Sequence, residues 1–135
     1  DLGLEPKQMK SVGFFSLEMS SEQLATRLLA AACALPSQKL LHGGLSHDEF
    51  NVLVRISTEM AQLPFHIDDT PALSIAALRT RARRLKRTAN LGLLVVDYLQ
   101  LVRASATKAS DNRVQEVSEI TQGLKAIAKE LDIPV

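Results

Sequence analysis

The chain has 135 residues, of which 46% are hydrophobic and 23% are charged, and its formal net charge is +1 at pH 7. This composition suits one domain with a core of ordinary size and excludes a globally basic nucleic-acid binder. The single cysteine, Cys33, excludes a disulfide framework and a cysteine-based metal cluster. The sequence shows no signal peptide and no apolar run of ~18 residues, so we expect a cytoplasmic protein with no membrane partner.

The first half of the chain contains two clear helix starts. Ser20 is followed three residues later by Gln23, and Ser46 is followed by Glu49, which are the residue types of a capping box. Pro36 is expected to stop the first of these helices. The predicted elements are an irregular lead-in over residues 1–10, a buried strand over 11–16, and helices over about 21–35 and 47–62.

The second half alternates short apolar runs with amphipathic stretches. The run "LLVVD" is too short for a typical helix and is expected to be a strand buried on both faces. Small, polar and basic residues over 103–112 predict a mobile loop. The predicted elements are strands over 63–69 and 93–97, a helix capped by Ser74, a long helix capped by Asp111 or Asn112, and the start of another strand at 133–135. Strands alternating with helices predict an α/β fold with a parallel sheet covered on both sides.

Acidic residues follow three of these apolar runs: Glu18, Asp68 with Asp69, and Asp97. Ligands of parallel sheets bind beyond the carboxyl ends of the strands, so these acids should lie along one edge. For Asp68 and Asp69 we favour the simpler interpretation of turn and cap residues.

Two acids at such an edge suit the hydrolysis of a nucleoside triphosphate. Asp97, mounted on a buried strand, could hold Mg²⁺ through water, and Glu18 on another strand could orient or deprotonate the attacking water. Phosphates are normally cradled by a loop of the pattern G-x-x-x-x-G-K-[ST], and none of the six glycines begins one. The residues by themselves therefore indicate two acids on a sheet but no complete nucleotide site.

Four segments closely resemble the motor domain of the bacterial replicative DNA helicases, the DnaB family. They are "FFSLEMSSEQLATRLL", "FHIDDTPALSIAALRTRARRLKR", "GLLVVDYLQLV" and "DNRVQEVSEITQGLKAIAKELDIPV". The resemblance covers nearly all of residues 11–135, in the family's order and with similar spacing. Residues 1–10 are less distinctive.

The resemblance implies a RecA-like ATPase fold, with residues 11–135 forming part of the helicase motor domain. It implies ATP and Mg²⁺ as cofactors and a homo-hexameric ring that moves 5′ to 3′ on single-stranded DNA and unwinds duplex at the replication fork. Primase and a helicase loader would be partners of the full-length protein, in the bacterial cytoplasm.

In that family the Glu of "SLEM" activates the hydrolytic water, which corresponds to Glu18, and the Asp of "DYLQL" is the Mg²⁺-associated acid, which corresponds to Asp97. The loop after "DYLQL" faces the central pore, which makes Arg103, Lys108 and Arg113 candidates for DNA backbone contacts. The basic stretch over 79–87 is better explained by a solvated outer face or a subunit contact than by phosphate binding.

The family's phosphate-loop strand lies before "SLEM", and its nucleotide-sensing glutamine, arginine finger and second DNA-contacting loop lie after "IPV". We therefore expect an incomplete RecA-like sheet that is inactive by itself. Two alternatives stay open. One is another RecA-like ATPase, of the recombination or clock type, and the other is a non-enzymatic interaction module.

Overall fold

The computed structural model describes residues 9–103 and 113–135. The chain divides into two compact units, one formed by Asp1–Glu18 with Pro64–Val135 and the other by Met19–Leu63, and each is described by itself. The first unit contains the strands β1 (Ser11–Ser16), β2 (Phe65–Asp68) and β3 (Leu91–Asp97), the 3₁₀ turn η1 (Leu99–Leu101), and the helices α4 (Ile75–Ala89) and α5 (Arg113–Leu131). The second contains α1 (Ser21–Ala32), α2 (Ser37–His42) and α3 (His47–Ala61).

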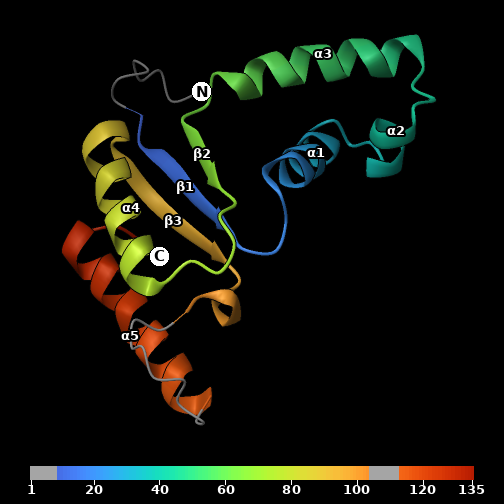
Figure 1. The fold of residues 1–135 in the computed structure, drawn as a ribbon. Coiled ribbons are helices and arrows are strands. Elements are labelled where there is room, and N and C mark those ends of the chain that lie inside the picture. The colour runs from blue at the N-terminus through green and yellow to red at the C-terminus, as the bar shows by residue number, and fades with distance from the viewer. Residues whose placement is uncertain (1–8, 104–112) are drawn as a thin grey trace. The chain divides into compact units, whose positions relative to one another are not determined.

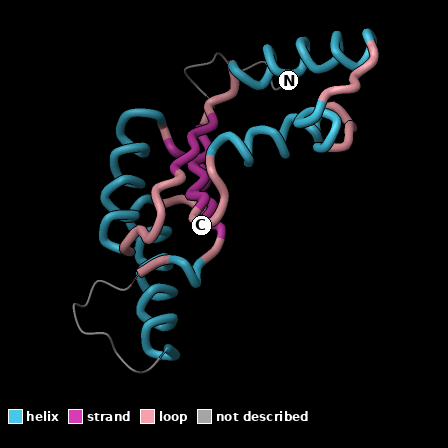
Figure 2. Tube along the Cα trace, turned by 45° about the vertical axis from the view of Figure 1, so that its right-hand side comes forward, coloured by secondary structure: helices cyan, strands magenta, loops and turns pink. Residues whose placement is uncertain are grey.

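The three strands form a parallel sheet in the order β2-β1-β3, which confirms the predicted α/β fold class (Figure 1). Alternate residues of β1 face the helices, so Phe15 is fully buried there, while Phe14 packs against Phe65 of β2 with ring centroids 6.2 Å apart. Figure 2 shows the three strands side by side. The sheet thus places the last residues of all three strands at one edge.

Strand β3 begins two residues earlier than predicted and is less buried. Asn90 ends α4 in the left-handed conformation at φ 51°, and Leu91 already pairs with β1. The register shifts beside Gly92, which is the local signature of a β-bulge. Leu93 is 37% exposed, so the prediction of a strand buried on both faces was wrong. The buried residues of β3, Leu91 and Leu94, lie on its face toward the helices.

Helices α4 and α5 pack on the sheet and on each other around one apolar core. Ile120 and Ile127 of α5 are fully buried, as is Leu78 of α4. At the crossing, Gly123 of α5 lies so close to Ile75 that a Cβ atom there would be 2.4 Å from the Ile75 Cγ1. The buried side of α5 continues to Leu131, whereas Val114 near the start of the helix is exposed.

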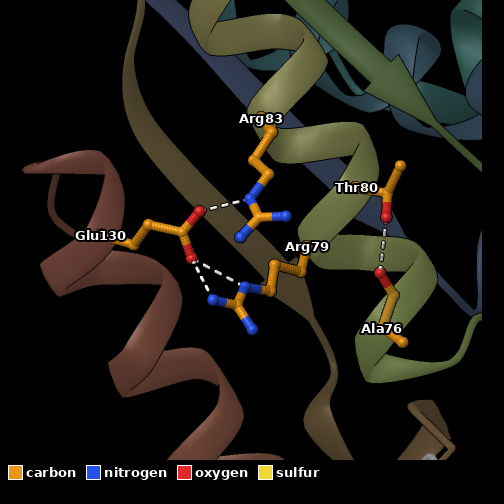
Figure 3. Close-up of polar contacts among 5 residues, drawn as sticks. All are labelled: Ala76, Arg79, Thr80, Arg83 and Glu130. Atoms are coloured by element: carbon orange, nitrogen blue, oxygen red, sulfur yellow. Dashed lines mark hydrogen bonds and ion pairs between the residues drawn. The ribbon is translucent and has the colours of Figure 1, made fainter.

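Part of the basic stretch over 79–87 forms ion pairs within this unit. Figure 3 shows the Glu130 carboxylate of α5 between Arg79 and Arg83, which lie one turn apart on α4. The hydrogen bonds from Arg83 and then from Arg79 lower the pKa of Glu130. Arg81 binds Asp68 instead. The helix therefore uses these three charges to join elements of its own unit, a use that the sequence interpretation did not include.

The second unit confirms both capping boxes, at Ser20 and at Ser46. The first helix is shorter than predicted and ends at Ala32, before Pro36. Ala34 takes the left-handed conformation at φ 54°, and the Leu35 amide donates to the Ala30 carbonyl, as in a Schellman motif. Pro36 then precedes α2, a helix that the sequence analysis did not predict.

Several predictions fall on residues outside the described ranges. These are most of the lead-in over 1–10, the loop over 104–112 with Lys108, and the caps at Asp111 and Asn112. The strand predicted at 133–135 is not formed, although the Leu94 amide donates to the Pro134 carbonyl over 3.1 Å. No helix in the described ranges is both long and apolar enough to cross a membrane.

Candidate active site

Glu18 and Asp97 lie at the carboxyl edge of two neighbouring strands. Ser16, the last residue of β1, is in register with Asp97, the last residue of β3. The Leu17 amide then donates to the Asp97 carbonyl over 2.8 Å, which extends the pairing by one residue and fixes the backbone just before Glu18. The predicted juxtaposition of these two residues along one edge is therefore present in the backbone.

The carboxylates of Glu18 and Asp97 lie in open surroundings. Both Glu18 and Asp97 are exposed, although Ser16 and Leu17 beside them are buried. Within residues 9–103 and 113–135, no hydrogen bond or ion pair engages either side chain. The strand ends therefore support two acid groups that stay open to ligands. The peptide bond from Asp97 to Tyr98 is cis.

Asp68 lies at the same edge but is committed to internal contacts. It pairs in register with Phe15, and its carboxylate accepts hydrogen bonds from Arg81 at 2.5 and 2.7 Å and from the Thr70 amide at 3.1 Å. Burial alone would raise the pKa of Asp68, but the hydrogen bonds from Arg81 and Thr70 outweigh it and lower that pKa. The Thr70 contact fits the predicted turn role of Asp68, whereas its ion pair with Arg81 of α4 was not predicted.

A cavity of about 400 Å³ lies beside the acid edge, the carboxyl edge of the sheet that carries Glu18 and Asp97. Its walls come from Leu17, the residues around Pro71, the segment from η1 to Arg103, and the start of α5. Arg103 and Arg113, two of the three predicted DNA contacts, both line it. Arg103 and Arg113, which flank the predicted pore-facing loop, therefore line the same cavity as Leu17, the residue before Glu18.

The two arginines are held in different ways. The Arg103 backbone bridges to the start of α4, with its amide donating to the Leu73 carbonyl over 3.0 Å, and its side chain is exposed. The Arg113 guanidinium donates to the Gln100 carbonyl over 2.7 Å and to the Glu116 carboxylate over 2.6 Å.

Gln100 and Glu116 were not predicted as partners of Arg113. Glu116 could have been found, because it lies three residues after Arg113 on a predicted helix. The contact with Gln100 had no such signal, since it depends on how η1 meets α5.

The donor set at this edge suits a hard cation that keeps much of its hydration. No group of three or more His, Cys, Asp or Glu side chains in the described part of the chain could enclose a metal ion. Mg²⁺ is commonly held by one or two carboxylates together with waters and substrate phosphates, and Asp97 offers one such carboxylate. Asp97 is therefore a residue that could help to hold such a cation.

Comparisons with known proteins show which family the chain resembles. Residues 3–135 match the family described as the DnaB-like helicase C-terminal domain. The chain is 61% identical over 129 residues to the replicative DNA helicase DnaB of Rickettsia prowazekii, and 42% identical over 129 residues to the replicative DNA helicase DnaC of Bacillus subtilis. Both alignments cover 96% of this chain, but it spans only 26% and 28% of those relatives.

Two solved structures share the fold. One is a DnaB-like replicative helicase, described with its interactions with primase, and the other is described as an ATPase domain. Each has a TM-score of 0.83 and 28% sequence identity and covers 93% of this chain, which spans 30% and 45% of them respectively. The family match over nearly the whole chain agrees with the resemblance found in the sequence. The chain belongs to the DnaB-like helicase C-terminal domain family.

Proposed function

We propose that this chain is the part of a replicative DNA helicase that supplies the two acidic groups for ATP hydrolysis. The observation that carries the proposal is the backbone pairing of Ser16 and Leu17 with Asp97, which holds Glu18 and Asp97 at one sheet edge with their carboxylates exposed. The family match and the names of the relatives support the choice of a helicase over a recombination or clock ATPase.

Glu18 acts as the general base in this proposal. It is exposed at the end of β1 without a described partner, so it can accept a proton from a water molecule. Asp97 would hold Mg²⁺ through water, and the bound cation would neutralise charge on the nucleotide phosphates. The two roles need separate strands, because the base must stand apart from the metal-associated acid.

The remaining parts of the reaction come from elsewhere in the full-length protein. The 135 residues contain no G-x-x-x-x-G-K-[ST] pattern, so they do not cradle the phosphates themselves. We propose that the full-length protein is a homo-hexamer that moves 5′ to 3′ on single-stranded DNA at the replication fork. Its partners would include primase, in line with the solved DnaB-like helicase, and a loader.

The proposed DNA contacts are Arg103 and Lys108. Arg103 lines the cavity beside the acid edge with an exposed side chain, and Lys108 follows it in the segment that the family resemblance places at the pore. Lysine and arginine contacts to phosphate give affinity without sequence preference, which suits a motor that must move along any sequence.

Asp97→Asn in the full-length helicase tests this function. We expect loss of duplex unwinding and a large rise in the Mg²⁺ concentration needed for ATP hydrolysis, because the amide no longer attracts the cation's water shell. Asp132→Asn is the matched control, since Asp132 is exposed beyond the far end of α5 and has a left-handed backbone that asparagine tolerates. Wild-type Mg²⁺ dependence in Asp97→Asn would contradict the proposal.

A further inference from the structure

Arg113 joins the first residue of α5 to the turn that follows the proposed Mg²⁺ acid. Its Nη2 donates to the Gln100 carbonyl over 2.7 Å, and its Nη1 donates to the Glu116 carboxylate over 2.6 Å. Gln100 lies in η1, three residues after Asp97. A single planar side chain therefore spans two elements that are 13 residues apart in the sequence.

Among the described residues of this turn, no backbone amide donates to the Gln100 carbonyl. Within this turn the Leu101 amide donates to the Tyr98 carbonyl over 3.0 Å, and the Val102 amide donates to the Leu99 carbonyl over 3.1 Å. The next amide, that of Arg103, donates to the Leu73 carbonyl instead. In the described part of the chain, the Gln100 carbonyl accepts its hydrogen bond from the Arg113 guanidinium. A hydrogen bond from a charged donor is stronger than one from a neutral donor.

Glu116 sets the direction of the Arg113 side chain. The Glu116 side chain is 28% exposed, and its carboxylate binds one guanidinium nitrogen from the next turn of α5, which leaves the other nitrogen to donate to Gln100. Arginine suits this task because its planar fork presents donors in fixed directions, whereas a lysine ammonium is a point charge. Both arginine side chains are exposed, but the Arg113 guanidinium is paired with Glu116, whereas no ion pair within the described residues engages Arg103.

We propose that Arg113 is a positioning residue for Asp97. It holds η1 against α5, and η1 in turn fixes the end of β3, where the Asp97 carbonyl pairs with the Leu17 amide. This gives Arg113 a different role from the DNA contact predicted from the sequence. The inference rests on the proposed function, because it takes Asp97 as the Mg²⁺-associated acid.

The first experiment measures amide hydrogen exchange in the 135-residue chain without nucleotide. In Arg113→Gln and in Glu116→Gln, the Leu101 and Val102 amides should exchange about fivefold faster, as expected for the loss of one half-exposed charge-assisted contact. Amides at the middle of β1 should be unchanged. Arg55→Gln and Glu59→Gln remove a comparable exposed helical ion pair on α3 and should not affect η1.

The second experiment uses the full-length helicase and separates this inference from the proposed function. Arg113→Gln and Glu116→Gln should both raise the Mg²⁺ concentration that half-saturates ATP hydrolysis, by about fivefold, with single-stranded DNA affinity and its salt dependence unchanged. Arg113→Lys should recover part of the loss. A DNA contact predicts the opposite pattern for Arg113→Gln, with weaker DNA binding and a salt slope reduced by about one.

The outcomes are distinguishable. If Asp97→Asn alters the Mg²⁺ dependence but Arg113→Gln and Glu116→Gln do not, the positioning role is wrong and the proposed function stands. If Asp97→Asn has no effect, the proposed function fails, whatever the exchange rates at η1 show. If Arg113→Gln weakens DNA binding while Glu116→Gln strengthens it, Arg113 is a DNA contact and the inference is overturned.

Discussion

Gly123→Ala tests the close packing of α4 on α5 in the unit that carries Glu18 and Asp97. A Cβ atom at residue 123 would lie 2.4 Å from the Cγ1 of Ile75 and 3.1 Å from its Cδ1. Ile75 is buried at the first residue of α4, so it has little room to move. The substitution therefore forces either a new Ile75 rotamer or a shift between the helices.

Two opposing terms determine how Gly123→Ala changes the free energy of unfolding. Alanine is favoured over glycine inside a helix by about 0.5–1 kcal/mol. Overpacking a buried contact costs about 1–3 kcal/mol. We therefore expect Gly123→Ala to lower the free energy of unfolding by about 1 kcal/mol, measured by urea unfolding followed by far-ultraviolet circular dichroism. Ser118→Ala is the matched control on the exposed side of α5 and should have a small stabilising effect.

The double variant with Ile75→Ala separates packing from helix propensity. Once the Ile75 side chain is shortened, the added methyl group fills vacated space, and Gly123→Ala should become stabilising by about 0.5–1 kcal/mol. The predicted result is a change of sign between the two backgrounds. Equal stabilisation by Gly123→Ala in both backgrounds would refute the close contact at this crossing.

Two further predictions concern the same chain. Asp68→Asn should lower the free energy of unfolding at neutral pH by about 1 kcal/mol, because the Arg81 pair is partly exposed. Since the folded pKa of Asp68 is below its ordinary value of 3.8, this contribution is present above that pH and is lost as the pH falls through the folded pKa. Urea unfolding of both proteins across that range should show their difference shrinking, and a constant difference would contradict the assignment. Calorimetry of the 135-residue chain with Mg-ATP should show no micromolar binding, because no phosphate-cradling pattern is present, and micromolar binding would show that these residues cradle the nucleotide without it.

The sequence predicted the elements that local chemistry determines. Serine followed by glutamine or glutamate three residues later marked the starts of α1 and α3, and "LLVVD" marked β3. The shared edge of Glu18 and Asp97 followed from strand direction alone, because parallel strands end on the same side. These features need no knowledge of which helix meets which.

Several of the features that were missed depend on contacts between distant segments. The Arg79 and Arg83 pairs with Glu130 join residues about 50 positions apart, and no spacing rule connects them. The cavity beside Leu17 exists only because η1, the segment near Pro71 and the start of α5 converge. The early end of α1 had a local cause, since Ala34 adopted a left-handed conformation that glycine or asparagine usually provides.

The most direct test of the account is single-turnover ATP hydrolysis by Glu18→Gln in the full-length helicase. The account predicts that the variant binds Mg-ATP with wild-type affinity and hydrolyses it at least about 100-fold more slowly, which is the usual contribution of a general base. Glu22→Gln, an exposed acid in the first turn of α1, is the matched control and should keep wild-type turnover. Wild-type turnover in Glu18→Gln would contradict the central claim that Glu18 activates the attacking water.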